Sequence, residues 1–320
     1  MKHLTADQRY EIFALLEAKQ TQTRIAEILN VNKSTICREI HRVCFNENIR
    51  YDPSEAQERA IRQGNYRKHL RKLNVKMRQL ISIHIRMHQW SPEQIAGFCK
   101  KNSIQMVSTE TIYQWVWKDK SYGGTLYKYL RHRGRRYRKR GNQYVSRSHN
   151  PDRRDISERP NEVEKRKRFG DFEIDTIVGA TSKQHILTIV DRVAKLSLMY
   201  KMFRPTQEGT SQKIIELLEP FARQGLLHTI TADNGFLFQK SKMVEDALQV
   251  KMYFARPYHS WERGTNENTN GLIRQYLPKG TDFTKVKDEV IHGIQEKLNN
   301  RPRKKLNYLT PNQYFKKLTD

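Results

Sequence analysis

Apolar residues recur at helical spacing near the start of the chain, which predicts three short helices between residues 4 and 42. The first covers residues 7–18, and Thr21 is placed to cap the second. A short turn then leads into the third helix, over residues 33–42, which is polar and basic. A helix, a tight turn and a basic second helix are typical of a helix-turn-helix, although an ordinary helical hairpin with solvated arginines has the same pattern.

A weaker copy of this pattern occupies residues 91–118. Ser91, Pro92 and Gln94 form a predicted N-terminal cap, with proline at the first helical position and glutamine completing a capping box. A further helix opens at Ser108 and carries tryptophans where the first copy has arginines. Packing and dimerisation are therefore open alternatives to DNA binding for this second module.

From residue 170 onwards the apolar positions alternate with polar ones, which is the period of a β-strand. The predicted strands cover residues 172–178, 185–190, 196–203, 226–232 and 251–255, and the predicted helices cover residues 207–221, 241–248 and stretches beyond 264. Three strands in a meander, followed by alternating helix and strand, predict a mixed α/β domain. That order of elements matches the ribonuclease-H-like fold.

The charge of the chain indicates its partner. Its 320 residues include 60 Lys plus Arg against 34 Asp plus Glu, a net charge of +26. Such an excess favours a polyanion, with a merely soluble basic surface as the alternative. Double-stranded DNA fits the helix-turn-helix, whose predicted DNA-facing residues are Ser34, Thr35, Arg38 and Arg42. At about 100–200 residues per domain, the length predicts two or three domains.

Two stretches between the modules are strongly basic. Residues 45–80 are predicted to be helical, with breaks at Pro53 and Gly64. Residues 131–168 read as a linker, because the part over 131–142 has seven basic residues, no acidic one and few apolar ones. We expect this linker to follow the phosphate backbone of bound DNA, with a spacer of no specific role as the alternative. Its predicted DNA contacts are Arg135, Arg136, Arg138, Lys139 and Arg140.

Several classes of protein are disfavoured. The longest apolar run covers only residues 12–16, whereas a membrane-spanning helix needs about 20 residues. The first residues lack the pattern of a signal peptide. The three cysteines have no Cys-x-x-Cys spacing, which argues against a zinc site or a disulfide framework and fits a reducing cytoplasm, where the protein would meet the bacterial nucleoid.

Three acidic residues are placed where chemistry is expected. Asp175 lies within the first predicted strand, Asp233 ends the fourth and precedes an Asn-Gly turn, and Glu267 lies near the start of a helix. Carboxylates without nearby histidine or cysteine favour Mg²⁺ or Mn²⁺. Two such ions can activate a hydroxyl group and stabilise the leaving oxygen in phosphoryl transfer. For any one of these residues taken alone, a turn cap or a surface charge is the simpler interpretation.

The interval between the last two acids leads to a known family. Thirty-three residues separate Asp233 from Glu267, the interval of many DDE transposases and retroviral integrases. The stretch over 258–283, which contains SWERGTNENTNG, closely resembles the signature of the insertion-sequence-thirty family of bacterial transposases, and TADNG over 231–235 matches that family's second motif. Arg274, two helical turns after Glu267, fits the basic residue of the pattern and would contact DNA near the cut.

The first motif departs from the family in one position. The family usually has an aromatic residue, Glu, Gly and Asp, whereas this chain has Ile174 where glycine is common. Glu173 shares a strand face with Asp175 and is therefore a possible fourth acid. Glu262 is a poorer candidate than Glu267 for the third acid, because it breaks the interval.

The resemblance covers nearly the whole chain and implies a multidomain protein. It divides into a helix-turn-helix domain at 1–45, a second helical module at 46–130, the basic linker at 131–168 and a ribonuclease-H-like, integrase-type catalytic domain at 169–320. The family implies binding to terminal inverted repeats, strand cleavage and strand transfer through a circular intermediate with joined ends. It also implies a homodimer or larger assembly on DNA, and two Mg²⁺ or Mn²⁺ ions held by Asp175, Asp233 and Glu267.

Two other functions remain open on the sequence. A transposase-derived regulator would bind DNA without catalytic activity, although it would have no reason to keep three acids at this interval. A structure-directed nuclease of the ribonuclease H type would cut DNA and never join it, although such an enzyme needs fewer DNA-binding modules.

Overall fold

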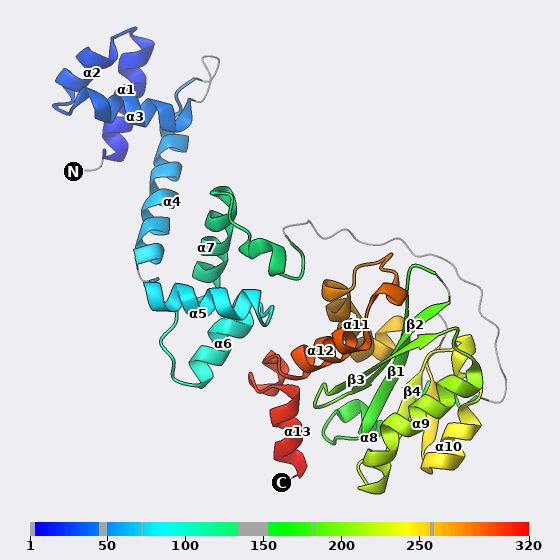
Figure 1. Cartoon of the computed structure of the whole chain (residues 1–320). Helices are drawn as coiled ribbons and strands as arrows, with labels where there is room; N and C mark the ends of the chain where they lie inside the picture. The colour runs from blue at the N-terminus through cyan, green and yellow to red at the C-terminus, as the bar shows by residue number, and fades with distance from the viewer. Residues whose placement is uncertain are drawn as a thin grey trace. The chain divides into compact units, whose positions relative to one another are not determined.

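The computed structural model of the chain describes residues 4–44, 50–71, 73–133, 153–181, 183–256 and 259–319. The chain divides into two compact units, Met1–Val75 and Lys76–Asp320 (Figure 1). The predicted linker contacts Arg135, Arg136, Arg138, Lys139 and Arg140 lie outside the described residues. Within the described ranges, no helix is both long enough and apolar enough to cross a membrane.

The first unit contains the three predicted short helices and a longer fourth one. They are α1 (Ala6–Glu17), α2 (Gln22–Ile28), α3 (Lys33–Val43) and α4 (Pro53–Arg71). Thr21 accepts a hydrogen bond from the backbone N–H of Arg24 and caps α2, as the sequence predicted. Ile12, Ile25 and Ile36 are fully buried where the first three helices meet. The predicted break at Gly64 is wrong, because α4 continues through it; a single glycine costs a helix only about 1 kcal/mol.

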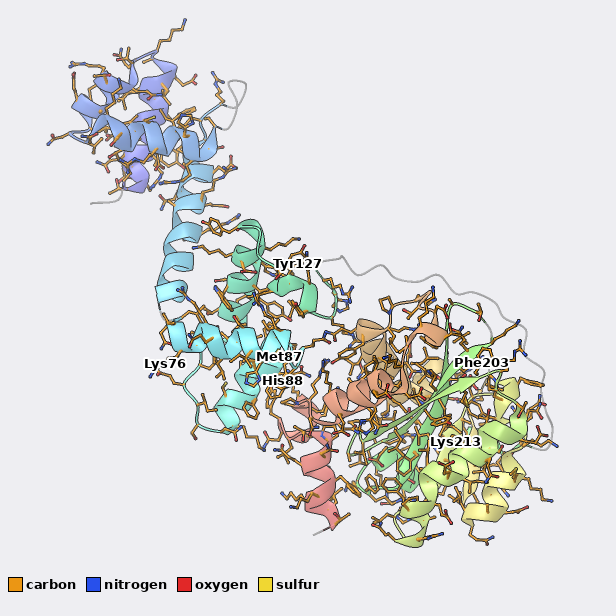
Figure 2. The ribbon with its side chains drawn as sticks, in the orientation of Figure 1. Lys76, Met87, His88, Tyr127, Phe203 and Lys213 are labelled. Carbon is orange, nitrogen blue, oxygen red and sulfur yellow. The ribbon has the colours of Figure 1, made fainter. Side chains whose placement is uncertain are left out.

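The second unit begins with a helical part. Its helices are α5 (Val75–Arg86), α6 (Pro92–Lys101), α7 (Thr109–Ser121) and the short η1 (Leu126–Tyr129). The predicted capping box is confirmed, since Ser91 and Gln94 exchange hydrogen bonds at the start of α6. Figure 2 labels Met87 and His88, which follow α5 directly. The ring of His84 stacks on Trp90 at 4.2 Å, which ties the end of α5 to the start of α6.

A five-stranded mixed sheet forms the centre of the second unit. Its strands are β1 (Asp171–Val178), β2 (Gln184–Asp191), β3 (Ser197–Phe203), β4 (Thr229–Ala232) and β5 (Lys251–Phe254). Their order across the sheet is β3-β2-β1-β4-β5. The meander β1–β3 is antiparallel, whereas β4 and β5 run parallel to β1. This is the order and direction of strands in the ribonuclease-H-like fold that the sequence predicted.

Helices cover both faces of the sheet (Figure 1). On one face lie α9 (Gln207–Arg223) and α10 (Ser241–Leu248), and on the other lie α11 (Gly264–Tyr276) and α12 (Asp288–Asn299). Each face of the sheet packs against its own hydrophobic core, because successive side chains of a strand point to opposite faces. In β2, Leu187 and Ile189 pack towards α9, whereas Ile186 packs towards α11. Lys213 of α9, labelled in Figure 2, lies 4.1 Å from the ring centre of Tyr200 in β3. The last helix, α13 (Pro311–Thr319), packs Phe315 against the α9 side of the core.

The predicted end of the basic linker at residue 168 is wrong. The described part of the chain resumes at residue 153, and Asp155 already forms a β-bridge with Phe254 at the edge of the sheet. The short helices η2 (Ile156–Glu158) and α8 (Asn161–Lys165) follow, with Val163 fully buried. The strongly basic sequence of this stretch also contains buried apolar residues, such as Ile156 and Val163, which pack it against the second unit.

Candidate functional site

The sheet brings Asp175 and Asp233 together at one end. β1 and β4 are parallel neighbours, and their register pairs Glu173 with Thr231. Asp175 lies two residues further along β1 and Asp233 directly follows the last residue of β4, so the two lie at the same end of the sheet. Both side chains are partly buried, and both line an open groove of about 680 Å³. The sequence predicted this meeting of two carboxylates, and the parallel pairing is its cause.

One cation of the chain lies between these two acids. Arg263, at the N-terminal cap of α11, has its Nη1 3.2 Å from Oδ2 of Asp175 and its Nη2 3.6 Å from Oδ2 of Asp233. Two carboxylates that converge on one cation, with oxygen donors only, are a suitable donor set for a hard divalent metal ion. The residues present therefore fit such an ion. In this structure the guanidinium of Arg263 occupies the position between the two carboxylates.

Further hydrogen bonds fix the two carboxylates. Asp175 accepts from the backbone N–H of Thr176 at 2.8 Å and from the amide of Asn270 at 3.1 Å. Asp233 accepts from the backbone N–H of Gly235 at 2.8 Å, in the Asn-Gly turn that the sequence showed. Burial raises the pKa of Asp175, Arg263 opposes this and the neighbouring Asp233 adds to it. Hydrogen bonds thus orient both carboxylates, and each carboxylate lies close to another charged side chain.

Glu267 lies on the helix that borders this pair. It follows Arg263 by four residues and precedes Asn270 by three, so it shares a helical face with two side chains that contact Asp175. Its own side chain is exposed. Across the described ranges, no three His, Cys, Asp or Glu side chains lie close enough to hold a metal ion together. The structure thus joins two of the three predicted acids and places the third on the adjoining helix face.

The two other glutamates have structural partners. Glu173 is fully buried, accepts a hydrogen bond from the backbone N–H of Asn266 at 2.8 Å, and lies 3.5 Å from Nε of Arg192. A carboxylate at this position binds the positive N-terminal end of α11 and anchors the helix to β1. Glu262 holds the preceding loop, because it accepts from both the backbone N–H and the guanidinium of Arg256.

Arg274 lies on α11 two turns beyond Glu267, as predicted. Its guanidinium donates to the carbonyl oxygen of Val178 at 2.7 Å and to that of Pro278 at 3.3 Å. These bonds tie the C-terminal part of α11 to the end of β1. To contact DNA as predicted, Arg274 would have to keep these bonds and donate with its remaining N–H groups, or exchange them for bonds to a phosphate.

The first unit presents part of the predicted DNA-reading face. Ser34 and Arg38 are exposed on α3, where Arg38 donates to the hydroxyl of Ser34 at 2.8 Å, and Thr35 is half-buried beside them. Arg42 differs from the prediction of a DNA-facing side chain, because it is partly buried and forms an ion pair with Glu39. Periodicity alone could not show that this buried carboxylate would engage it.

Several residues that sequence reasoning missed also line or border the site. Arg153 donates to the side-chain oxygen of Asn234 at 3.2 Å and lies over the ring of Phe254, next to Asp233. Lys183 and Arg204 line the groove with the two acids. Arg263 stands inside the signature and one helical turn before Glu267, a spacing that could have indicated it; the other three come from distant segments.

Comparisons with known proteins agree with this architecture. Residues 1–43 match a family model described as a helix-turn-helix domain. The chain is 47% identical to the transposase for insertion sequence element IS4351 of Bacteroides fragilis, covering 99% of this chain and 96% of that protein. It is 32% identical to the transposase InsI for insertion sequence element IS30A of Escherichia coli K12, covering 99% and 85%.

A solved structure is also similar in part. The catalytic core domain of BIV integrase aligns with 46% of this chain and 94% of its own, at 16% identity and a TM-score of 0.36.

Proposed function

The chain belongs to the insertion-sequence-thirty (IS30) family of transposases, and from this premise we propose that Asp175, Asp233 and Glu267 are the acids that cut and join its DNA. The observation that carries the proposal is the convergence of Asp175 and Asp233 on one cation at the ends of two parallel strands. Glu267 lies on the helix face that borders them.

We propose that the three carboxylates hold Mg²⁺ or Mn²⁺, two ions for each site. When bound, such ions supply a more acidic attacking hydroxyl and stabilise charge on the leaving oxygen. The chain itself supplies the positioning. Asn270 and the N–H groups of Thr176 and Gly235 orient the carboxylates of Asp175 and Asp233. Glu173 fixes the start of α11 and with it the position of Glu267.

The groove beside the acids would take the DNA strand that reacts. Lys183, His185 and Arg204 line it together with Asp175 and Asp233, so basic groups face the path of a phosphate backbone. The predicted base readout belongs to Ser34, Thr35 and Arg38 on α3, whereas Arg274 and the linker arginines would contact phosphates. Phosphate contacts would supply affinity, and the contacts of α3 would supply recognition of the terminal inverted repeats.

Both ends of the element must be cut and joined together in this reaction. We therefore propose that the protein acts as a homodimer or larger assembly on DNA, and that the two ends pass through a circular intermediate in which they are joined. The family resemblance supports both statements. They follow from the chemistry of transposition and not from any interface of the single chain.

A joining assay on a short DNA element, built from the gene's own flanking sequence, tests the proposal. The wild type, Asp233→Asn and the matched control Asp246→Asn, an exposed residue of α10, would be compared in Mg²⁺ and in EDTA. End-to-end junctions that need both Mg²⁺ and Asp233 are expected, with the control unaffected. Tight binding of intact ends without any cut or junction would favour the DNA-binding regulator instead.

A further inference from the structure

A second basic pocket lies on another side of α11. It has a volume of about 340 Å³ and is lined by five basic side chains, Arg166, Lys195, Arg303, Lys304 and Lys305, against one acidic side chain, Glu93. Its other walls come from the starts of α6 and α11. The pocket shares no lining residue with the groove that contains Asp175 and Asp233.

The five cations come from three separate places in the chain. Arg166 ends α8 in the left-handed backbone region, with φ of 50°. Lys195 occupies the turn between β2 and β3 and is also left-handed, with φ of 61°. The others belong to the segment at η6 (Lys304–Leu306) and the residue before it. The fold therefore gathers like charges from distant segments, which costs energy unless an anion compensates them.

Of these five cations, only Lys304 forms a salt bridge within the part of the chain that the structure describes. Glu93 is already paired with Lys304 at 2.6 Å. Arg303 donates to the carbonyl oxygen of Leu298 at 3.0 Å, and its buried Nε has no hydrogen-bond partner there. Burial, with nearby Arg301 adding, lowers the pKa of Arg303 to about 9. A partly buried guanidinium that has no carboxylate beside it favours binding of an anion.

Lys195 adds a second partly buried cation to the pocket, and its Nζ donates to the carbonyl oxygen of Arg192. Its Nζ lies 3.4 Å from the hydroxyl of Thr265, in the first turn of α11. Burial, with the charges of Arg166 and Lys305 adding to its effect and those of Glu173 and Asp191 opposing it, lowers the pKa of Lys195 to about 8.

We propose that this pocket binds a backbone phosphate of duplex DNA. The choice of DNA over a small anion rests on the rim, where Arg166, Lys304 and Lys305 are exposed and leave the pocket open to a long polyanion. It also rests on the proposed function, in which DNA passes the groove at Asp175. The pocket would then hold the duplex at the start of α11, on the side away from Asp175, and so extend the DNA path around the helix that carries Glu267.

Lysine reactivity in the full-length protein tests whether the pocket is occupied. The protein would be acylated with a limiting amine reagent at pH 8 in EDTA, alone, with duplex DNA or with pyrophosphate, and each lysine read by peptide mass spectrometry. Because the pKa of Lys195 is about 8, it should react readily in the free protein. Duplex DNA should slow its modification and that of Lys305 several-fold, with less change at Lys316, exposed on α13.

Protection by pyrophosphate without protection by duplex DNA would overturn the proposal in favour of a small-anion site. Equal protection at Lys316 would also overturn it, because that result would mean that DNA binds non-specifically over the whole basic surface. The assay is run without metal, so a failure of cleavage in the joining assay and a failure of protection here are separate results.

A pair of substitutions gives a second, independent measurement. Lys305→Glu and Lys316→Glu make the same charge change at exposed positions, so both variants should fold. Lys305→Glu should weaken duplex binding about 10-fold more than Lys316→Glu and lower the salt slope of binding by about one ion further. Equal losses in affinity and slope would overturn the proposal.

Discussion

The guanidinium of Arg263 lies 3.2 Å from the carboxylate of Asp175 and bridges it to Asp233. A divalent ion bound by these two acids would need the oxygens that Arg263 now engages. Binding of metal would therefore include displacement of an internal cation, and the displaced guanidinium would be free to contact a DNA phosphate in the groove. Arg263 is in this view a positioning residue that keeps the acids together before metal binds.

We predict that Arg263→Gln binds Mn²⁺ more tightly than the wild type, by about 10-fold, because an ion then competes with no charged side chain. Titration calorimetry or the electron paramagnetic resonance of free Mn²⁺ would measure this without reference to activity. Arg256→Gln is the matched control, since Arg256 pairs with Glu262 and not with the two acids. Unchanged or weaker Mn²⁺ binding by Arg263→Gln would show that Arg263 assists the metal site instead of competing with it.

Glu267 and Glu262 can be separated by comparing their glutamine variants. Glu267 is exposed, so Glu267→Gln should leave the free energy of unfolding within about 0.5 kcal/mol of the wild type. The same variant should lower the cleavage rate by about 100-fold or more, because it removes a proposed metal ligand. Thermal unfolding and single-turnover cleavage of an end-containing duplex would measure the two effects.

Glu262→Gln should behave in the opposite way. It removes charge-assisted bonds to Arg256 that hold the loop before α11, so stability should fall by about 1–2 kcal/mol. Cleavage at saturating metal should fall much less than in Glu267→Gln. If Glu262→Gln abolished cleavage and Glu267→Gln kept it, the third acid would be Glu262.

The sequence predicted the fold of the second unit well because its signals are local. Alternation with period two located β1, further apolar runs located the other four strands of the sheet that the structure describes, and the Asn-Gly turn after Asp233 marked the end of β4. The two-residue interval between Glu173 and Asp175 predicted that they share a face of β1, and in the structure both accept hydrogen bonds from α11. Once β1 and β4 are known to be parallel neighbours, Asp175 and Asp233 are expected to lie close together at the same end of the sheet.

What the sequence did not predict depends on partners that are far apart in the chain. Arg192 and Glu173 form a buried ion pair across 19 positions, and Arg159 donates to Thr231 across 72. When these partners are unknown, the two arginines are interpreted as solvated charges and Glu173 as a possible fourth acid. The predicted end of the linker was wrong, and the ion pair of Arg42 with Glu39 was missed, for the same reason: charged residues were taken as surface residues.

The N-terminal unit contains a buried ion pair with a measurable cost of removal. Nε of Arg9 lies 2.6 Å from Glu39, and both side chains are less than 5% exposed. Glu39→Ala leaves Arg9 buried without a carboxylate, so the unit should lose about 3–5 kcal/mol of stability. Hydrogen exchange of α1 and α3 in the full-length protein would report this loss.

Glu27→Ala is the control for this experiment. Glu27 pairs with Arg24 on the surface, where both side chains are more than half exposed, so its removal should cost less than about 1 kcal/mol. The double replacement Arg9→Met with Glu39→Leu should recover much of the loss, because it removes both buried charges together. A loss in Glu39→Ala no larger than in Glu27→Ala would contradict the structural importance of the pair.

The stack of His84 on Trp90 predicts a dependence of stability on pH. The two rings are nearly parallel, at an angle of 6°. Burial, with the charge of His88 adding, lowers the pKa of His84 to about 4 from 6.5. The folded protein therefore holds the neutral ring. Its contribution to stability is complete above pH 6.5 and is lost as the pH falls towards 4, up to about 2–3 kcal/mol.

His84→Phe should remove this dependence, because phenylalanine keeps an aromatic ring against Trp90 and has no proton to bind. Urea unfolding of the full-length wild type at pH 7 and pH 4.5, followed by Trp fluorescence, should show a larger loss of stability than the same experiment on His84→Phe. His88→Gln, at an exposed position, serves as the control and should retain most of the loss. If His84→Phe lost as much stability on acidification as the wild type, the acid sensitivity would lie in other groups, such as the carboxylates paired with arginine.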